Sequence, residues 1–290
     1  MAELIRHKHV PKTCRIYCTG DHHVGARAWH KQAHEDFVQT VKDDPLGYWI
    51  DLGDGIEGKP TRSKHFDPRS LRPGLMTIEE QVDEWCRIHK PIADKCLSKG
   101  KGNHDLYMEP DWNVTRYICD RLSLPQGDYQ TWIDIGHFRI FAYHGRRNIP
   151  RGAKDPRQRF GNQTAWLQRT LEELAGNCLV MLHGHIHTLH VARPIEKLAL
   201  LARGDGVRAR HFFQPTQTVK TKNPVTKKVD SREYIPPDSR WYAVTGTFRR
   251  TGGFGFTDYS ELGGYSPTIP GFQIIHVDDG AVRDIEPVMV

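Results

Sequence analysis

The sequence predicts an α/β protein in which two β-sheets pack together and helices cover their outer faces. Over the first two thirds of the 290 residues, short β-rich runs alternate with segments of helical periodicity. Beyond Thr188 the helical patterns end and only β-like runs remain. Alternation followed by consecutive strands is typical of this layered architecture. Because one large α/β domain can occupy this length, we expect a single domain over residues 1–290.

Each element is predicted from the spacing of its apolar residues. In the segment 112–122, for example, Val114, Tyr117, Ile118 and Leu122 have the spacing of one helical face. The remaining helices are expected at 29–41, 78–89 and 162–175. Strands are expected at 15–19, 48–52, 96–102, 178–182, 199–202, 241–245, 273–277 and 281–287. A hairpin across Gly136 joins two further strands, 129–135 and 138–143.

Two segments have the composition of loop insertions. Residues 59–75 combine prolines with basic side chains, and residues 203–239 are polar, basic and without a clean period. The second segment holds eight Lys and Arg residues against four Asp and Glu residues. We expect it to lie beside the functional site and to follow an anionic backbone.

Composition favours an anionic partner and suggests a metal. The net charge is +6 with a pI near 9.0, which attracts anions over long range. Of the 17 histidines, seven lie in four short motifs. The six cysteines form no Cys-x-x-Cys pair, so we expect buried free thiols and no zinc ribbon.

Nothing in the sequence predicts a membrane partner. No apolar run approaches the roughly 20 residues that span a bilayer. The first 11 residues are rich in Arg, Lys and His and lack the apolar core of a signal peptide. We therefore expect the protein in the cytoplasm of the cell that makes it, and the sequence leaves its oligomeric state open.

Five short polar clusters each follow a predicted strand. In chain order they are Gly20-Asp21-His22-His23-Val24-Gly25, Gly53-Asp54-Gly55-Ile56-Glu57-Gly58, Gly102-Asn103-His104-Asp105, Tyr143-His144-Gly145 and His183-Gly184-His185-Ile186-His187. One such cluster alone has an ordinary explanation, since Gly-Asp is common in turns. Five in succession indicate a shared site, because rigid strands in α/β sheets fix the loops at their carboxyl ends around one crevice.

The residue types in these clusters suit metal ions. Alternate residues of an extended chain point to the same side, so Asp21 and His23 can reach one ion together. By the same reasoning, His185 and His187 can both face inward. Carboxylate, amide and imidazole ligands suit manganese, iron or zinc.

In this order the clusters resemble the motifs of the calcineurin-like metallophosphoesterases: Asp-x-His, Gly-Asp, Gly-Asn-His-Asp/Glu, His and Gly-His-x-His. The resemblance covers residues 15–188 and implies a four-layer α/β/β/α sandwich of two mixed β-sheets flanked by helices. It also implies two divalent transition-metal ions, with manganese favoured and iron, zinc or nickel as alternatives. The first would be held by Asp21, His23 and His187, the second by Asn103, His144 and His185, with Asp54 bridging the two.

The resemblance also implies a mechanism. Two cations roughly 3.5–4 Å apart hold a bridging water and lower its pKa to about 7, which supplies hydroxide for in-line attack on phosphorus. His104 lies outside both metal shells in the family arrangement, and we expect it to protonate the leaving group. We expect Asp105 to orient the His104 ring. His22 and His183, beside the ligands, are expected to support the ligands from behind or to line the substrate site, and not to bind a metal.

The substrate is less well defined. We favour phosphodiester bonds of nucleic acid, DNA or RNA, as in the DNA-repair nucleases that the chain resembles. Arg146, Arg147 and the basic segment 203–239 would suit a polyanion. Lys101 and Glu57-Gly58-Lys59 depart from the Arg and Asp-Arg-Gly of the family's protein phosphatases, which argues against a phosphoprotein.

Two alternatives stay open. The chain could be a phosphatase or phosphodiesterase for small nucleotides, or a binding module that keeps the metals without catalysis. The intact His104 argues against the second alternative, because a scaffold gains nothing from a leaving-group acid. Residues 241–267 loosely resemble the C-terminal part of phage-encoded members of the family, which would place the protein in a host cytoplasm.

Overall fold

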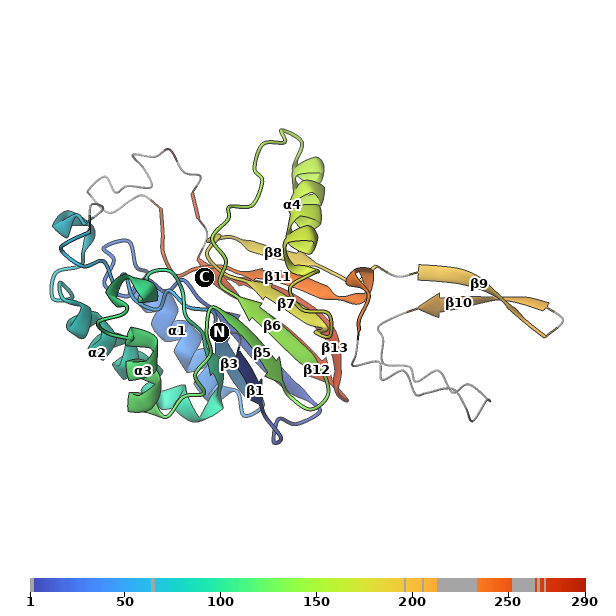
Figure 1. The fold of residues 1–290 in the computed structure, drawn as a ribbon, viewed down its shortest axis with the longest axis horizontal. Helices are drawn as coiled ribbons and strands as arrows, with labels where there is room; N and C mark the ends of the chain where they lie inside the picture. Colours follow the sequence, from blue (N-terminus) through green and yellow to red (C-terminus); the bar gives the residue numbers. More distant parts are fainter. Residues whose placement is uncertain are drawn as a thin grey trace.

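The computed structural model describes residues 3–63, 66–195, 197–204, 206–212, 234–251, 264, 267–268 and 270–290. Two large mixed sheets form the centre of the molecule (Figure 1). The five-stranded sheet has the order β13 (Ala281–Met289), β12 (Gly271–Asp278), β2 (Cys14–Thr19), β3 (Gly47–Asp51), β4 (Cys96–Lys99). The six-stranded sheet has the order β1 (Glu3–Arg6), β5 (Gln130–Asp134), β6 (Arg139–Tyr143), β7 (Val180–His183), β11 (Trp241–Thr245), β8 (Leu189–Ala192).

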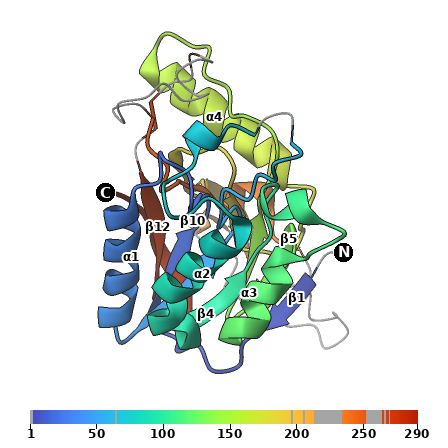
Figure 2. The ribbon, with the colours of Figure 1, turned by 90° about the vertical axis from the view of Figure 1, so that its left-hand side faces the viewer.

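Strand alternation divides the core into layers. Ile16 of β2 and Ile50 of β3 pack with Leu182 of β7 in a cluster that fills the space between the two sheets. Tyr17, the next residue along β2, belongs to a second cluster with Phe37 of helix α1 (Lys31–Asp43). Helices α2 (Ile78–His89) and α3 (Val114–Leu122) complete that layer, and Figure 2 shows α1, α2 and α3 on one side of the molecule.

Helix α4 (Pro156–Leu171) covers the outer face of the six-stranded sheet. Its Leu167 and Leu171 are fully buried and pack with Phe141 of β6 and Met181 of β7. The order of layers is therefore helices, five-stranded sheet, six-stranded sheet, helix. This arrangement confirms the predicted α/β class with two mixed sheets flanked by helices.

Most predicted elements form close to where the sequence places them. Helix α2 has the predicted bounds. Its start is determined by a capping box: the Thr77 hydroxyl accepts from the Glu80 amide, and the Glu80 carboxylate accepts from the Thr77 amide. Helix α4 begins at Pro156 and not at the predicted position 162. The Asp155 side chain caps its first turn and Pro156 has the φ angle of a helix start, so the helix continues through Gly161.

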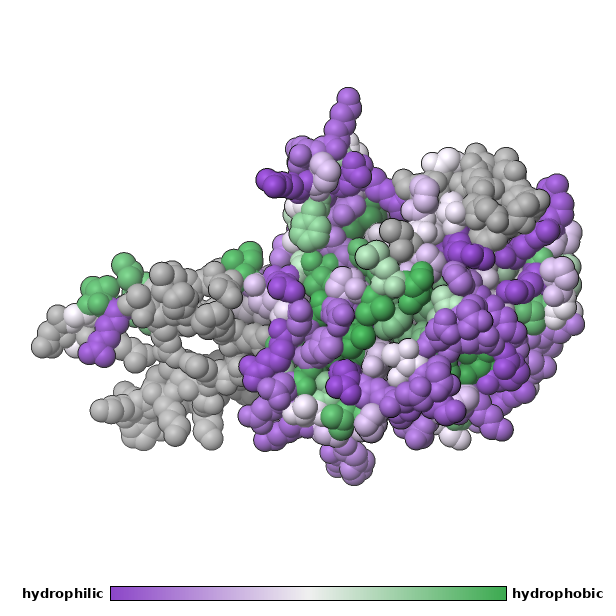
Figure 3. All heavy atoms as spheres, turned by 180° about the vertical axis from the view of Figure 1, so that it is seen from behind, coloured by the Kyte–Doolittle hydropathy of each residue, from purple (hydrophilic) through white to green (hydrophobic). Residues whose placement is uncertain are grey.

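Three strands were not predicted. They are β1, β8 and β10 (Gly206–Phe212), and β1 and β8 have only four residues each, too few to show a clear period. Strand β10 pairs antiparallel with β9 (Lys197–Arg203) in a hairpin that projects from the body of the molecule (Figure 1). Viewed from behind, this projection carries hydrophobic side chains (Figure 3), and Leu200 and Val207 are 71% and 66% exposed.

The two predicted insertions are described to different extents. Residues 59–75 include the short 3₁₀ helix Pro68–Ser70 and are described except for 64 and 65. Of the segment 203–239, residues 205 and 213–233 lie outside the described residues, so its predicted course along a substrate is untested. All six cysteines are buried and free, as expected. Among the described residues, no helix has the length and apolar character needed to cross a membrane.

Candidate metal centre

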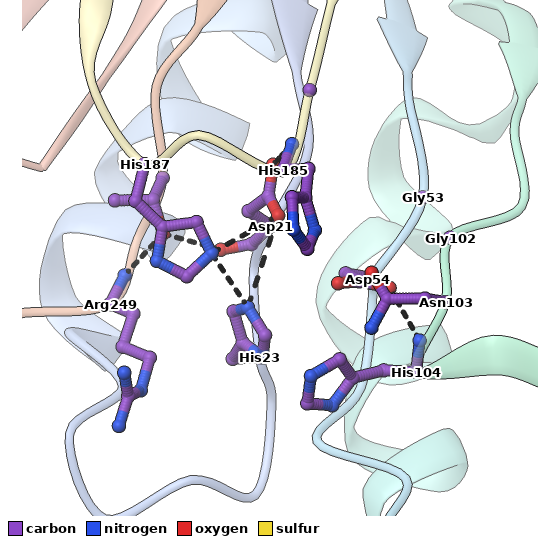
Figure 4. Close-up of polar contacts among 12 residues, drawn as sticks. Asp21, His23, Gly53, Asp54, Gly102, Asn103, His104, His185, His187 and Arg249 are labelled. Carbon is purple, nitrogen blue, oxygen red and sulfur yellow. Dashed lines mark hydrogen bonds and ion pairs between the residues drawn. The ribbon is translucent and has the colours of Figure 1, made fainter. Parts of the chain in front are cut away.

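The five polar clusters meet at one edge of the two sheets. Asp21 follows β2, Asp54 follows β3, Asn103 follows β4, and His144 follows β6, while β7 ends at His183. Short backbone hydrogen bonds join neighbouring loops: the amide of Asp21 donates to Gly53 O (2.8 Å), and the amide of His23 donates to Asp54 O (3.0 Å). Figure 4 shows the side chains of these loops directed toward a common centre.

One group of ligand atoms comes from both sheets. Nε2 of His187 lies 3.2 Å from Asp21 Oδ1 and 3.1 Å from Nε2 of His23 (Figure 4). Nδ1 of His23 lies 3.0 Å from the Glu57 carboxylate, which fixes the ring so that Nε2 faces the group. A carboxylate oxygen and two imidazole nitrogens therefore converge, as the binding of one transition-metal ion requires.

A second group lies beside the first. His144 places Nδ1 3.0 Å from Leu52 O, and its Nε2 lies 3.2 Å from both Asp54 Oδ2 and Asn103 Oδ1. His185 brings a buried Nδ1 that has no partner among the described residues. Ligand atoms of Asp21, Asp54, His144 and His185 all lie within 4.8 Å of one another. The donor types and the unpartnered nitrogen fit a second cation.

The structure brings all seven predicted ligands together. Asp21 takes part in both groups, whereas Asp54 belongs to the second. The predicted bridge at Asp54 therefore stays a prediction, and Asp21 is a competing candidate for the shared position. The assignment of each residue to a particular ion also stays a prediction.

Five of the seven predicted ligands have left-handed backbone conformations. Their φ angles lie between 51° and 65°, in a region that residues other than glycine seldom adopt: Asp21, His23, Asp54, His185 and His187. Such conformations cost of order 1–3 kcal/mol each and persist where the surroundings enforce them. Here the Thr247 hydroxyl and the Phe248 amide both donate to Asp21 O, at 2.8 and 3.2 Å. Strain concentrated in this way is typical of a functional site.

Two glycines allow the loops to approach so closely. Gly53 has φ +107°, and a Cβ there would lie 2.2 Å from the Gly102 amide nitrogen. A Cβ on Gly102 would lie 2.1 Å from Asp54 Oδ1. Since both distances are far inside van der Waals contact, neither position tolerates a side chain. The two glycines thus set the position of Asp54.

The electrostatics keep both buried aspartates ionised. Burial alone would raise the pKa of Asp54, but the charges of His144 and His104 hold it well below its usual value. Burial would likewise raise the pKa of Asp21, but the charge of His187 lowers it. Burial lowers the pKa of His23 to about 4, so this imidazole is neutral at pH 7, as a metal ligand must be.

His104 stands at the side of the cluster with one ring nitrogen fixed. Its Nδ1 lies 2.6 Å from Glu57 O, and its ring meets the His23 ring edge-on at 4.6 Å. The expectation that Asp105 orients this ring is corrected by the structure. The Asp105 carboxylate accepts instead from the amides of Gly102 (2.8 Å) and Asp54 (3.0 Å), so it shapes the loops that carry the ligands.

His22 does not line the site, so of its two predicted roles only support from behind the ligands stays a prediction. It is fully buried beneath α1 and α2, where its ring stacks on His34 at 4.4 Å. Its Nδ1 accepts from the Trp85 indole (3.0 Å), and its Nε2 lies 2.9 Å from the Thr19 hydroxyl. Both ring nitrogens thus have protein partners, and neither is available to a substrate.

The remaining predicted contact residues line one cavity. Arg146, Arg147 and His183 border a space of about 420 Å³ next to α4. Arg146 is two residues beyond the predicted ligand His144, and His183 is two residues before the predicted ligand His185. Their contact with the substrate stays a prediction.

Sequence reasoning missed two residues of the site. Glu57 was noted only as a departure from a family motif, yet its carboxylate holds His23. Arg249 belongs to no motif, but Figure 4 places it beside His187, and it is 6% exposed. The position of Glu57, three residues after Asp54 in the same cluster, was a signal for it. Nothing in the sequence pointed to Arg249.

No protein-family model matches the sequence, and no curated protein sequence matches it. Among solved structures, the chain is similar to a novel archaeal phosphodiesterase, with 12% identity and a TM-score of 0.44, covering 95% of this chain and 99% of the other. It is similar to YfcE, a phosphoesterase from E. coli, with 12% identity and a TM-score of 0.39, covering 94% and 98%. It is also similar to the Pseudomonas putida nuclease MPE, with 14% identity and a TM-score of 0.34, covering 94% and 87%.

At these identities and TM-scores, the expected resemblance to metallophosphoesterases depends on the fold and on the geometry of the site itself. No comparison supports the phage origin suggested by the sequence of residues 241–267. Within that stretch, residues 252–263 lie outside the described residues.

Proposed function

We propose that the chain is a dinuclear metal-dependent phosphoesterase that hydrolyses phosphodiester bonds, with nucleic acid as its substrate. The observation that carries the proposal is the convergence of Asp21, His23 and His187 beside Asp54, His144 and His185. Burying this many carboxylate and imidazole groups together costs free energy, so such a cluster persists where it has a function. Their donor types fit two divalent cations, with manganese favoured.

The chain's own residues would prepare this centre. When bound, two such cations would supply Lewis-acid chemistry, polarising phosphoryl oxygens and lowering the pKa of a bound water molecule. Glu57 would hold His23 with Nδ1 as donor, and Leu52 O would do the same for His144, so that each Nε2 is directed inward. Asp21 and Asp54 would supply the negative charge that retains the cations.

His104 would transfer the proton that the leaving oxygen needs. Glu57 O holds its Nδ1, and its edge contact with His23 places the ring beside the ligand cluster. In the protonated form its Nε2 can donate to a leaving alkoxide. Since Nδ1 is engaged by the protein, Nε2 is the atom from which the proton would leave.

The proposal is tested with two chromogenic esters. We expect manganese-loaded protein to hydrolyse bis-p-nitrophenyl phosphate and to lose this activity with a chelator or with Asp54→Asn. Asp111→Asn, which changes an aspartate whose side chain is 67% exposed, is the matched control and should keep the activity. Turnover of p-nitrophenyl phosphate alone would favour a monoesterase. No turnover of either ester would favour the binding module without catalysis.

Nucleic acid is proposed as the substrate because the protein carries a positive charge. The net charge of +6, the basic segment 203–239 and the pair Arg146-Arg147 support a polyanionic substrate. The test of this substrate is to incubate the metal-loaded protein with linear and circular double-stranded DNA, single-stranded DNA and RNA. Cleavage of free nucleotides or cyclic nucleotides with none of these polymers would favour the small-nucleotide alternative.

A further inference from the structure

The cavity next to α4 is a feature that the metal chemistry leaves unexplained. It holds about 420 Å³, within the range of sites that bind small molecules, and none of the seven predicted ligands lines it. Three arginines border it: Arg146 and Arg147 from the loop after β6, and Arg169 from α4. Two aromatic rings, Tyr143 and Trp166, contribute to the same wall.

The cavity carries uncompensated positive charge. All arginine–carboxylate ion pairs among the described residues involve other arginines, so no carboxylate of these residues pairs with Arg146, Arg147 or Arg169. The Arg146 guanidinium lies 5.9 Å from the Tyr129 ring centroid, and Arg169 donates only Nε to Ala165 O. Guanidinium groups stay protonated and match phosphate oxygens two at a time. The cavity is therefore suited to a phosphate.

His183 adds a hydrogen-bond acceptor. The residue is fully buried, and its Nδ1 donates to Gly184 O at 2.6 Å, which leaves Nε2 with a lone pair. This Nε2 is buried and has no partner among the described residues. A buried acceptor without a partner destabilises the protein, and a ligand N–H or O–H group would remove that cost.

Strand register places the cavity next to the metal centre. Tyr143 of β6 pairs in parallel with His183 of β7, so both side chains lie on the same face of the sheet, and their rings meet at 5.3 Å. That is the face covered by α4, whose Trp166 ring lies 5.6 Å from the His183 ring. His144, the residue after Tyr143 in the chain, is directed to the ligand cluster. The cavity and the ligand cluster therefore adjoin the same strand end.

We propose that the cavity is a subsite for a nucleotidyl group of the substrate. Its phosphate would bind the three arginines, its sugar hydroxyl or base amine would donate to His183 Nε2, and its rings would lie against Trp166. This inference deepens the proposed function and rests on it. The nucleotidyl group can belong to a nucleic acid or to a free nucleotide, and the two sources are separated by experiment.

The first test compares two diesters that share a leaving group. Thymidine 5′-monophosphate p-nitrophenyl ester has a nucleotidyl group, and bis-p-nitrophenyl phosphate does not. In the double variant Trp166→Ala/Arg169→Ala, the ratio of kcat/KM for the first ester to that for the second should fall about 10- to 100-fold. Arg157→Ala, an exposed arginine of the same helix that does not line the cavity, should keep the ratio. An unchanged ratio in the double variant overturns the subsite.

The second test needs no catalysis. Thymidine 5′-monophosphate and a short oligothymidylate are titrated by calorimetry into the chelator-treated protein. Both should bind at least tenfold more weakly to the double variant, and equal affinity for wild type and variant overturns the subsite. If only the oligonucleotide binds more weakly to the double variant, the nucleotidyl group belongs to a nucleic acid. If only the mononucleotide binds more weakly, it belongs to a free nucleotide. If neither ester is hydrolysed while binding depends on Trp166 and Arg169, the proposed function fails and the subsite stands.

Discussion

The Nε2 atoms of His23 and His187 lie 3.1 Å apart, although the two residues are 164 positions apart in the chain. His23 follows a strand of the five-stranded sheet, and His187 follows a strand of the six-stranded sheet. Glu57 fixes His23, and Asp21 Oδ1 lies 3.2 Å from His187 Nε2, so each ring is held in place. Metal ions bound here would link the two sheets at the edge where their loops meet.

The first prediction concerns metal stoichiometry. Chelator-treated protein reloaded with manganese should contain two ions per chain by elemental analysis after gel filtration. Asp54→Ala should reduce binding at both positions if Asp54 is the shared ligand, and Asp21→Ala should do so if Asp21 is. Asp111→Ala should keep both ions. A wild-type stoichiometry that stays at one would contradict the dinuclear centre.

The second prediction separates proton transfer from metal binding. His104→Asn should keep both metal ions but lower kcat about 10²- to 10⁴-fold for an alkyl leaving group, because no side chain then protonates the departing oxygen. The loss should be much smaller for p-nitrophenolate, which leaves without a proton. Steady-state kinetics on both ester types, with metal analysis of the same samples, checks this. Equal losses for the two leaving groups would remove His104 from this role.

The third prediction concerns Glu57 as a positioning residue. Its carboxylate binds His23 Nδ1 at 3.0 Å and Lys59 Nζ at 2.7 Å, so Glu57→Ala frees the His23 ring. Metal affinity should fall about 10- to 100-fold, as measured by competition with a fluorescent chelator. Glu57→Gln retains an oxygen acceptor and should recover part of the affinity. If both variants bind metal like wild type, the contact with His23 has no role in metal binding.

The fourth prediction is a loss of stability in mild acid. Burial lowers the pKa of His34 to about 3, against 6.5 in the unfolded chain. Between these values the unfolded chain takes up a proton that the folded chain does not. The free energy of unfolding should therefore fall as the pH falls through this window, by about 1.4 kcal/mol per pH unit for this group.

Urea unfolding at pH 7.5, 6.5 and 5.5, with a chelator present, measures that slope. His34→Gln should flatten it, whereas His276→Gln, which changes a partly exposed histidine paired with Glu286, should leave it as in wild type. A slope that is the same in the His34 variant and in wild type would show that the acid sensitivity comes from other groups.

The fifth prediction concerns the basic segment 203–239. Replacing Lys220, Lys222, Lys227 and Lys228 with alanine should weaken nucleic-acid binding and flatten its salt dependence, by about one unit of slope for each lysine that binds a phosphate. Hydrolysis of bis-p-nitrophenyl phosphate should change little, since no predicted metal ligand is altered. Fluorescence anisotropy at several salt concentrations measures the affinity and its slope. Unchanged affinity and slope would favour the small-nucleotide alternative.

The sequence alone predicted the layer order and, through the resemblance of its five clusters to metallophosphoesterase motifs, seven candidate metal ligands. It could do so because both depend on local patterns. Strand alternation and helical spacing are properties of neighbouring residues, and each ligand lies in a short cluster directly after a strand. Asp21 and His23 needed no knowledge of distant segments to be singled out. The capping box at Thr77 and Glu80 likewise set the start of α2 within the sequence itself.

Only the tertiary structure decided what the neighbouring side chains do. His22 and His23 are adjacent in the chain, yet one stacks on His34 in the core and the other faces the ligand cluster, because the left-handed turn at His23 separates their directions. His104 is held by the Glu57 carbonyl and not by Asp105 next to it, and His183, Arg146 and Arg169 come together around one cavity. These contacts join residues far apart in the sequence, and their distances depend on how the two sheets and α4 pack. No local pattern encodes that packing.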